Sequence, residues 1–333
     1  MKLKSLILIV LALCAFAVPA LAQDTNRVIF NDFSFSYDSS LATNVNIVQF
    51  AGDPPELEQP GGPEVKHTEF RLHNALTNDV PSSFEAPAFI RVYRTADFAG
   101  YDSAANNVQQ LTTLLAASAD LAQFTTVDAE NTSSNQLPFM PEMPAGQIIR
   151  ARAQYAETPF VRGISYVTVY RQDVSPFLAN EFWWTFQGVS VDGVYYISAL
   201  VRLNTPLFPA EFPAEFDMAT FESQFVEYLT QSVVTLNNAA QEEFTPNLSM
   251  LDTLVQSFTF ESLAGVPVPL PEPLPSPDQP TPDVEPTEIA DATFGGLACP
   301  TWTLVSFTLP DATQPVIEGT TVTLSFNQEG AGG

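Results

Sequence analysis

Two histidines and a glutamate stand close together in one short stretch of this sequence. His67, Glu69 and His73 belong to the alternating run HTEFRLH, which predicts a β-strand with all three side chains on one face. Imidazole and carboxylate groups are suitable ligands for a transition metal. However, positions i and i+6 of a strand lie about 20 Å apart, too far for one ion. We therefore expect a solvated strand face here, with no metal and no cofactor.

A second group of chemically capable residues is basic. Residues 147–155 and 160–170 predict a β-hairpin that contains Arg150, Arg152 and Arg162. Alternation places Arg150 and Arg152 on one face and Arg162 on the other, although a one-residue shift of register would bring all three together. The pattern is compatible with an anion-binding pocket or with ion pairs to the many carboxylates.

The third group is aromatic and lies in residues 181–203, EFWWTFQGVSVDGVYYISALVRL. The dipeptide Asp192-Gly193 between two alternating apolar runs is the strongest short signal for a hairpin with a two-residue turn. Counting outward from that turn gives the register, and one face becomes apolar throughout. We expect that face in the protein core, with the following residues on it: Phe182, Trp184, Phe186, Ile197, Ala199, Val201 and Leu203.

The opposite face of this hairpin carries Trp183, Tyr196 and Arg202. The register sets Trp183 against Arg202, a pair suited to a cation–π interaction. This face is half polar. It is either covered by a helix or loop, or it forms a shallow aromatic binding surface.

Motifs for catalysis are missing from the sequence. It has no Gly-x-Ser-x-Gly elbow, no His-Glu-x-x-His, no phosphate-binding glycine loop and no cysteine between residues 23 and 298. With two histidines, few groups could act as a general base near neutral pH. A hydrolase that uses paired carboxylates stays open as an alternative, because the chain has 38 acidic residues.

The elements that must position these residues follow from periodicity and turn chemistry. Strands are expected in residues 27–38 (two short ones), 45–50, 67–73, 86–94, 147–155, 160–170, 181–203 and 257–261. Helices are expected in residues 103–121, from 217 onward, and in 248–255, and a long irregular segment in 119–146. The pattern predicts an α+β fold, an antiparallel β-sheet with flanking helices.

The start of the chain has the three parts of a signal peptide. Two lysines precede an apolar run, and Ala20-Leu21-Ala22 provides small residues for cleavage. We therefore expect residues 1–22 to be removed and the protein to be secreted, periplasmic or at the cell surface. Cys14 is a poor lipidation site because Leu13 precedes it. No later segment is apolar enough to span a membrane.

The charge of the chain limits its partners. Without the two lysines of residues 1–22, ten basic residues remain against 38 acidic ones, a formal net charge of −28. Phosphate-rich partners would be repelled, so we expect no nucleic acid and no anionic membrane surface as a partner. An envelope or extracellular ligand is the expected partner.

Composition divides the remainder of the chain. Residues 23–262 predict one globular domain, residues 263–290 an acidic linker rich in proline, and residues 291–333 a separate small segment. Cys299 is the one cysteine after the signal peptide, so it cannot form an internal disulfide. We expect it to pair outside the chain or beyond residue 333.

The last segment contains Trp302-Thr303-Leu304-Val305-Ser306 and the alternating residues Val322, Leu324 and Phe326. It resembles the opening of the META domain, also called the HslJ-like domain, over about 35 residues. The resemblance implies a small β-rich domain of envelope proteins without established enzymatic activity, and it transfers no functional residues. It also implies that this domain is only begun within residues 291–333.

The order of elements in residues 27–261, and the helix-to-strand step Leu251-Asp252-Thr253-Leu254-Val255-Gln256-Ser257-Phe258, are similar to the α/β sandwich of PsbP-like proteins. This likeness concerns the fold and carries no function. Taken with the absent catalytic motifs, the sequence favours a non-enzymatic binding or adaptor module outside the cytoplasm. A purely structural envelope protein is the alternative.

Overall fold

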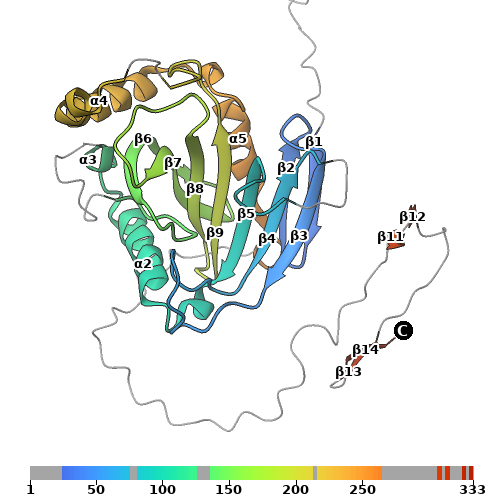
Figure 1. The fold of residues 1–333 in the computed structure, drawn as a ribbon. Coiled ribbons are helices and arrows are strands. Elements are labelled where there is room, and N and C mark those ends of the chain that lie inside the picture. The colour runs from blue at the N-terminus through green and yellow to red at the C-terminus, as the bar shows by residue number, and fades with distance from the viewer. Residues whose placement is uncertain are drawn as a thin grey trace, which may run out of the picture. The chain divides into compact units, whose positions relative to one another are not determined.

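The computed structural model describes residues 25–75, 81–125, 136–212 and 216–264, together with four short strands after residue 305 (Figure 1). The chain divides into two units, residues 1–274 and residues 275–333. The predicted signal peptide, residues 265–290 of the expected linker, and Cys299 lie outside the described residues.

The first unit is built on a seven-stranded antiparallel sheet with strand order β3-β4-β5-β9-β8-β7-β6 (Figure 1). Its strands are β3 (Asn44–Phe50), β4 (His67–His73), β5 (Ala88–Arg94), β6 (Gly146–Glu157), β7 (Val161–Arg171), β8 (Phe182–Ser190) and β9 (Tyr195–Leu203). Its flanking helices are α2 (Asp102–Ala117), α3 (Ala122–Thr125), α4 (Met218–Asn238) and α5 (Leu248–Gln256). The predicted α+β class, with an antiparallel sheet and flanking helices, is confirmed.

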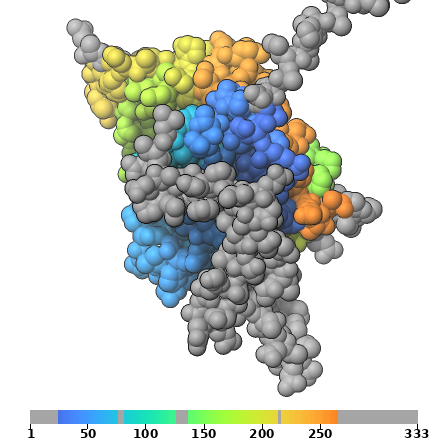
Figure 2. Space-filling model, turned by 90° about the vertical axis from the view of Figure 1, so that its right-hand side faces the viewer, coloured from blue at the N-terminus to red at the C-terminus, as the bar shows by residue number. Residues whose placement is uncertain are grey.

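A second, smaller sheet has the order β1-β2-β10. It joins β1 (Thr25–Phe30) and β2 (Phe33–Asp38) to β10 (Thr259–Phe260), near the end of the unit. Figure 2 shows this side of the molecule, where the N-terminal strands (blue) lie at the surface next to the region of α5 and β10 (orange). The last strand of this unit therefore pairs with β2, near the start of the described residues.

The aromatic hairpin predicted from residues 181–203 is the central part of the large sheet. β8 and β9 pair with Trp183 opposite Arg202 and Phe186 opposite Ala199, which is the predicted register. The turn itself differs from the predicted two-residue form, because residues 191–194 lie between the two strands and Gly193 N donates to the Ser190 carbonyl (2.8 Å). Gly193 adopts φ 75°, a conformation that glycine takes without strain.

Both faces of the large sheet are buried. One face packs on α4, α5 and the small sheet, and all seven residues of the predicted core face lie there. The other face packs on α2 and on residues 137–140. Polar side chains also lie on this second face, and buried polar groups need hydrogen-bond partners. The apolar face has no such requirement.

The described residues of this unit also contain three short 3₁₀ turns: η2 (Thr95–Phe98), η4 (Gln241–Glu243) and η5 (Glu261–Leu263). The last of them buries Leu263 against the core. Among the described residues, no helix is both long and apolar enough to cross a membrane.

The second unit contains two short antiparallel pairs. β11 (Ser306–Leu309) pairs with β12 (Ala312–Pro315), and β13 (Ser325–Asn327) with β14 (Gly330–Gly332). Of the residues that carry the resemblance to the META domain, 302–305 and 321–324 lie outside the described residues.

Candidate functional site

The polar face of the aromatic hairpin is covered by other parts of the protein. Tyr196 is fully buried and Trp183 is 8% exposed. Arg202 lies at the edge of this face, with its guanidinium 4.3 Å from the Trp183 ring, as the register predicted. The structure thus favours the covered face over the shallow aromatic surface, since only Arg202 of these three residues is exposed.

Two glutamine side chains hold the segment that covers this face. The amide of Gln187 accepts a hydrogen bond from Met140 N (2.9 Å) and donates one to Met140 O (3.2 Å). Gln147 forms the same pair of bonds with Leu137 N (2.8 Å) and O (3.3 Å). Each side-chain amide thereby forms the pair of hydrogen bonds that the backbone of a neighbouring strand would otherwise form. This arrangement satisfies the buried backbone of residues 137–140, part of the segment predicted to be irregular.

The three arginines of the basic hairpin are not brought together. A β-bulge in β6 sets residues 152 and 153 against Tyr166 alone, and Arg152 has a φ of 55°. Arg150 consequently reaches the carbonyl of Phe124 in α3 (2.7 Å), whereas Arg152 reaches α4 on the other side. The expectation that Arg150 and Arg152 share one face is wrong, because a bulge changes the alternation of side chains.

Arg152 binds the carboxyl end of helix α4. Its Nη1 donates to the carbonyls of Leu236 (3.0 Å) and Ala239 (2.6 Å), and its guanidinium lies 5.5 Å from the Phe244 ring. Leu236 lies in the last turn of α4 and Ala239 is its C-cap residue, where carbonyls have fewer helical partners and the helix dipole favours a cation. By contrast, Arg162 forms the predicted kind of ion pair, with Glu157 at 2.5 Å.

The bulge opens a small polar cavity of about 170 Å³ between β6–β8 and the helices α4 and α5. We call it the bulge pocket. It is lined by Arg152, Ala153, Gln154, Ser165, Tyr166, Val167, Trp184, Asn237, Gln241, Leu248 and Asp252. Ser165 lies on the strand position opposite Phe186, within a layer that is otherwise apolar.

Arg152 and Asp252 are the two charged residues of this lining, and they carry opposite charges. Burial raises the pKa of the Asp252 carboxyl, an effect that the positive charge of Arg152 opposes. Gln154 Nε2 donates to Asp252 Oδ1 (3.2 Å). Among the ion pairs of the described residues, none joins Arg152 to Asp252. The pocket therefore has a cation and an anion that do not neutralise each other by contact.

A wider cavity of about 530 Å³ adjoins the same bulge. It shares Arg152, Ala153, Gln154 and Asn237 with the bulge pocket and adds residues of 119–125 and Tyr155. The bulge thus separates two hollows, of which the smaller reaches the buried residues Ser165 and Trp184.

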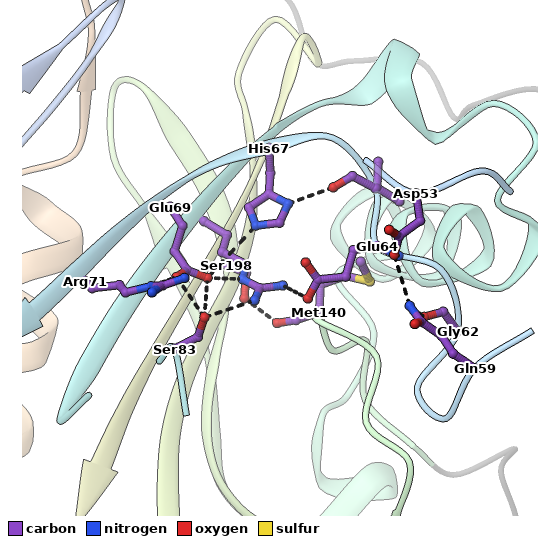
Figure 3. Close-up of polar contacts among 12 residues, drawn as sticks. Asp53, Gln59, Gly62, Glu64, His67, Glu69, Arg71, Ser83, Met140 and Ser198 are labelled. Atoms are coloured by element: carbon purple, nitrogen blue, oxygen red, sulfur yellow. Dashed lines mark hydrogen bonds and ion pairs between the residues drawn. The ribbon is translucent and has the colours of Figure 1, made fainter. Parts of the chain in front are cut away.

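A second polar group lies on β4 and β5, where Glu69 and Arg91 face each other across the strands. Figure 3 shows Glu69 of this group beside Arg71 and Ser83. Glu69 accepts from Arg91 Nε (2.6 Å), from Ser83 Oγ (2.8 Å) and from Arg71. Glu69 is 0% and Arg91 2% exposed. The prediction of a solvated strand face for residues 67–73 is wrong, because a charged neighbouring strand and residues 64–65 and 83 bury that face.

His67 belongs to this buried ionic cluster. Its Nδ1 donates to the carbonyl of Val65 (2.7 Å), which leaves Nε2 as an acceptor 3.9 Å from Glu69 Oε2. Burial, assisted by the charge of Arg91, lowers the pKa of His67 to about 4. Within the described part of the chain, the buried Nε2 has no hydrogen-bond partner. Burial raises the pKa of Tyr93 to about 12.

The ionic cluster lies apart from the two cavities described above. Neither of the two cavities is lined by any of its residues. His73 lies six residues from His67 along β4 and is paired with Asn46. In the part of the chain that the structure describes, no three His, Cys, Asp or Glu side chains are grouped so as to hold a metal ion.

Sequence reasoning found Arg152 but missed the rest of the bulge pocket. Asp252 had one available signal, since it lies four residues after Leu248 on α5 and so shares the inward side of that helix. A lone carboxylate at such a position marks a polar interruption of the core. Gln154, Ser165, Asn237 and Gln241 gave no local signal, because ordinary surface positions carry the same residue types.

We compared the chain with protein-family models, with curated proteins and with solved structures, and found no match. The function must therefore be inferred from the site itself.

Proposed function

We propose that this protein is an exported, non-enzymatic binding module that holds a small polar ligand in the bulge pocket. One observation carries the proposal: a cavity lined by polar side chains interrupts the apolar layer between the sheet and the helices. Ligand sites are typically concavities with a few polar groups placed among apolar ones. The left-handed conformation of Arg152 at its rim is also a form of backbone strain that is common at functional sites.

Binding is favoured over catalysis by the composition of the lining. The bulge pocket has no histidine, cysteine or lysine, and Asp252 is its one carboxylate. A hydrolase of the paired-carboxylate kind needs a second carboxyl group within about 10 Å of the first. The lining supplies amides, a hydroxyl and two opposite charges, which are groups that orient a ligand.

Export is supported by residues 1–22 and by the strongly acidic composition of the remaining chain. We propose a secreted, periplasmic or cell-surface location on this basis. We also propose that residues 291–333 begin a META-like domain and that the first unit is related to the PsbP-like sandwich. The second idea draws support from the order of hairpins, middle helix, hairpins and final helices.

A ligand screen by thermal unfolding tests the proposed function. The purified protein without residues 1–22 is heated with amino acids, monosaccharides, nucleosides and divalent ions. A ligand at 100 times its Kd should add about 2.7 kcal/mol to the free energy of unfolding and raise the Tm measurably.

The matched variants are Ser165→Leu, which fills the bulge pocket, and Thr113→Leu on the exposed side of α2. We expect Ser165→Leu to abolish the ligand-dependent shift and Thr113→Leu to keep it. A protein that no ligand stabilises would point to the structural alternative. A shift that survives Ser165→Leu would place the ligand elsewhere.

A further inference from the structure

The bulge pocket has two charged side chains of opposite sign, each with hydrogen-bonding atoms left unused within the described residues, and this restricts what it can bind. Arg152 uses Nη1 for the α4 carbonyls, and its Nε and Nη2 have no hydrogen-bond partner in the described residues. Arg152 is thus anchored by one nitrogen while two donors stay available. A guanidinium held in this way is suited to bind a carboxylate through two parallel hydrogen bonds.

Asp252 offers the complementary group. Its Oδ1 accepts from Gln154, and its Oδ2 has no partner within the described part of the chain. The carboxylate is partly buried, so its charge is poorly compensated by water. A ligand cation beside Oδ2 would supply the missing compensation.

We infer that the ligand of the bulge pocket is a free α-amino acid with a small side chain, its carboxylate on Arg152 and its ammonium on Asp252. The inference rests on the proposed function and names the ligand class for that same site. A simple anion would meet repulsion from Asp252, and a simple cation would meet repulsion from Arg152. A molecule that carries both charges on groups attached to one carbon atom satisfies both residues at once.

The size and the remaining lining agree with this ligand. At about 170 Å³ the cavity is smaller than the ~300–1,000 Å³ of sites for drug-sized molecules, which favours one amino acid over a peptide. Gln154, Asn237 and Gln241 provide amide groups, and Ser165 a hydroxyl. These groups suit a side chain that makes hydrogen bonds, such as that of serine.

Calorimetric titration tests the inference with four probes. L-Serine carries both charges, L-lactate carries only the carboxylate, ethanolamine carries only the ammonium, and glycerol carries neither. We expect the wild-type protein to bind L-serine and to bind the other three at least tenfold more weakly.

The decisive variant is Asp252→Asn, which keeps the shape of the side chain and removes its charge. This variant should bind L-serine at least tenfold more weakly than the wild type does. It should bind L-lactate more tightly than the wild type does, because Asp252 no longer repels the carboxylate of the ligand. A variant that is merely unfolded would weaken both probes. Asp120→Asn, in the neighbouring cavity, is the matched control and should leave L-serine binding within twofold.

The outcomes separate the two levels of the proposal. If glycerol or a monosaccharide binds best and Ser165→Leu removes that binding, the binding function stands and the amino-acid inference is wrong. If Asp252→Asn binds L-serine as tightly as the wild type does, the inference is also wrong. If no probe and no member of the wider screen binds, both the inference and the proposed function fail.

Discussion

At the scale of single residues, the carboxylate of Glu69 has the most demanding environment. It is fully buried and accepts hydrogen bonds from Arg91, Arg71 and Ser83. The pKa of Glu69 is lowered: burial alone would raise it, but the charge of Arg91 and the hydrogen bonds outweigh that effect. Removing one partner of a buried pair leaves the other charge without compensation, which is far more costly than losing a surface pair.

We therefore expect Glu69→Gln to reduce the free energy of unfolding by about 3–5 kcal/mol. Glu157→Gln removes the partner of Arg162 in an ion pair whose glutamate side chain is 61% exposed, and it should cost less than about 1 kcal/mol. Urea unfolding of the two variants provides the comparison. Equal costs would mean that Glu69 is not buried as described.

His67 makes stability depend on pH. Its pKa is about 4 in the folded protein and about 6.5 in the unfolded chain, so the unfolded state takes up the proton first as pH falls. Stability from this group is complete above pH 6.5, decreases as pH falls through 6.5, and stops decreasing near pH 4. Between pH 7 and pH 5 the loss is on the order of 2 kcal/mol.

The variant His67→Gln isolates this contribution. Urea unfolding at pH 7 and at pH 5 should show a smaller loss of stability in His67→Gln than in the wild type, by about 2 kcal/mol. Both proteins share the same carboxylates, so their common acid sensitivity cancels in the comparison. An identical loss in the two proteins would contradict the assigned burial of His67.

At the scale of elements, β7 and β8 depend on a close approach that side chains would prevent. Gly163 and Gly188 face each other across these strands, and the Phe186 ring covers them. A Cβ on Gly163 would lie 2.6 Å from Phe186 Cε2 and 2.7 Å from the Gly188 Cα. Phe186 is fully buried, so the ring has little room to move away.

Gly163→Ala should therefore destabilise the protein by about 1–3 kcal/mol, the usual cost of overpacking a core. Gly146→Ala is the matched control at the start of β6. Its Cβ would meet Ile148 Cδ1 at 3.4 Å, an ordinary contact. Thermal unfolding should show a lower Tm for Gly163→Ala and little change for Gly146→Ala, and the reverse order would contradict the packing of Phe186 on the glycine pair.

At the scale of the whole molecule, the predicted cleavage of the signal peptide sets the form in which the protein acts. Small residues at positions 20 and 22 favour processing after Ala22. Mass spectrometry of the exported protein should give an N-terminus at Gln23. Ala22→Phe should block processing, and Cys14→Ser should leave it unchanged. A lipid-modified N-terminus at Cys14 would contradict this prediction.

The local pattern of the sequence was sufficient to predict the strands and the longer helices of the first unit and the register of the central hairpin, but not α3, which lies in the segment expected to be irregular. Alternation, turn residues and caps are properties of neighbouring residues, so they can be read without knowing the fold. The Asp192-Gly193 turn shows this clearly, because it determines every cross-strand pair of β8 and β9. Asp217 is a further example, since it caps α4 as its residue type suggests.

Only the tertiary structure determined which faces of these elements are buried and which side chains from distant elements are in contact. Alternation correctly placed His67 and Glu69 on one face, but burial of that face depends on Arg91 from another strand and on residues 64–65 and 83. Likewise, the bulge at Arg152 occurs together with its hydrogen bonds to the end of α4, 84 residues away in the chain. Long-range contacts of this kind leave no periodic trace in the sequence, because the partners are set by the packing of distant segments. The bulge pocket therefore could not be predicted from the sequence, because it forms only where β6, α4 and α5 pack together.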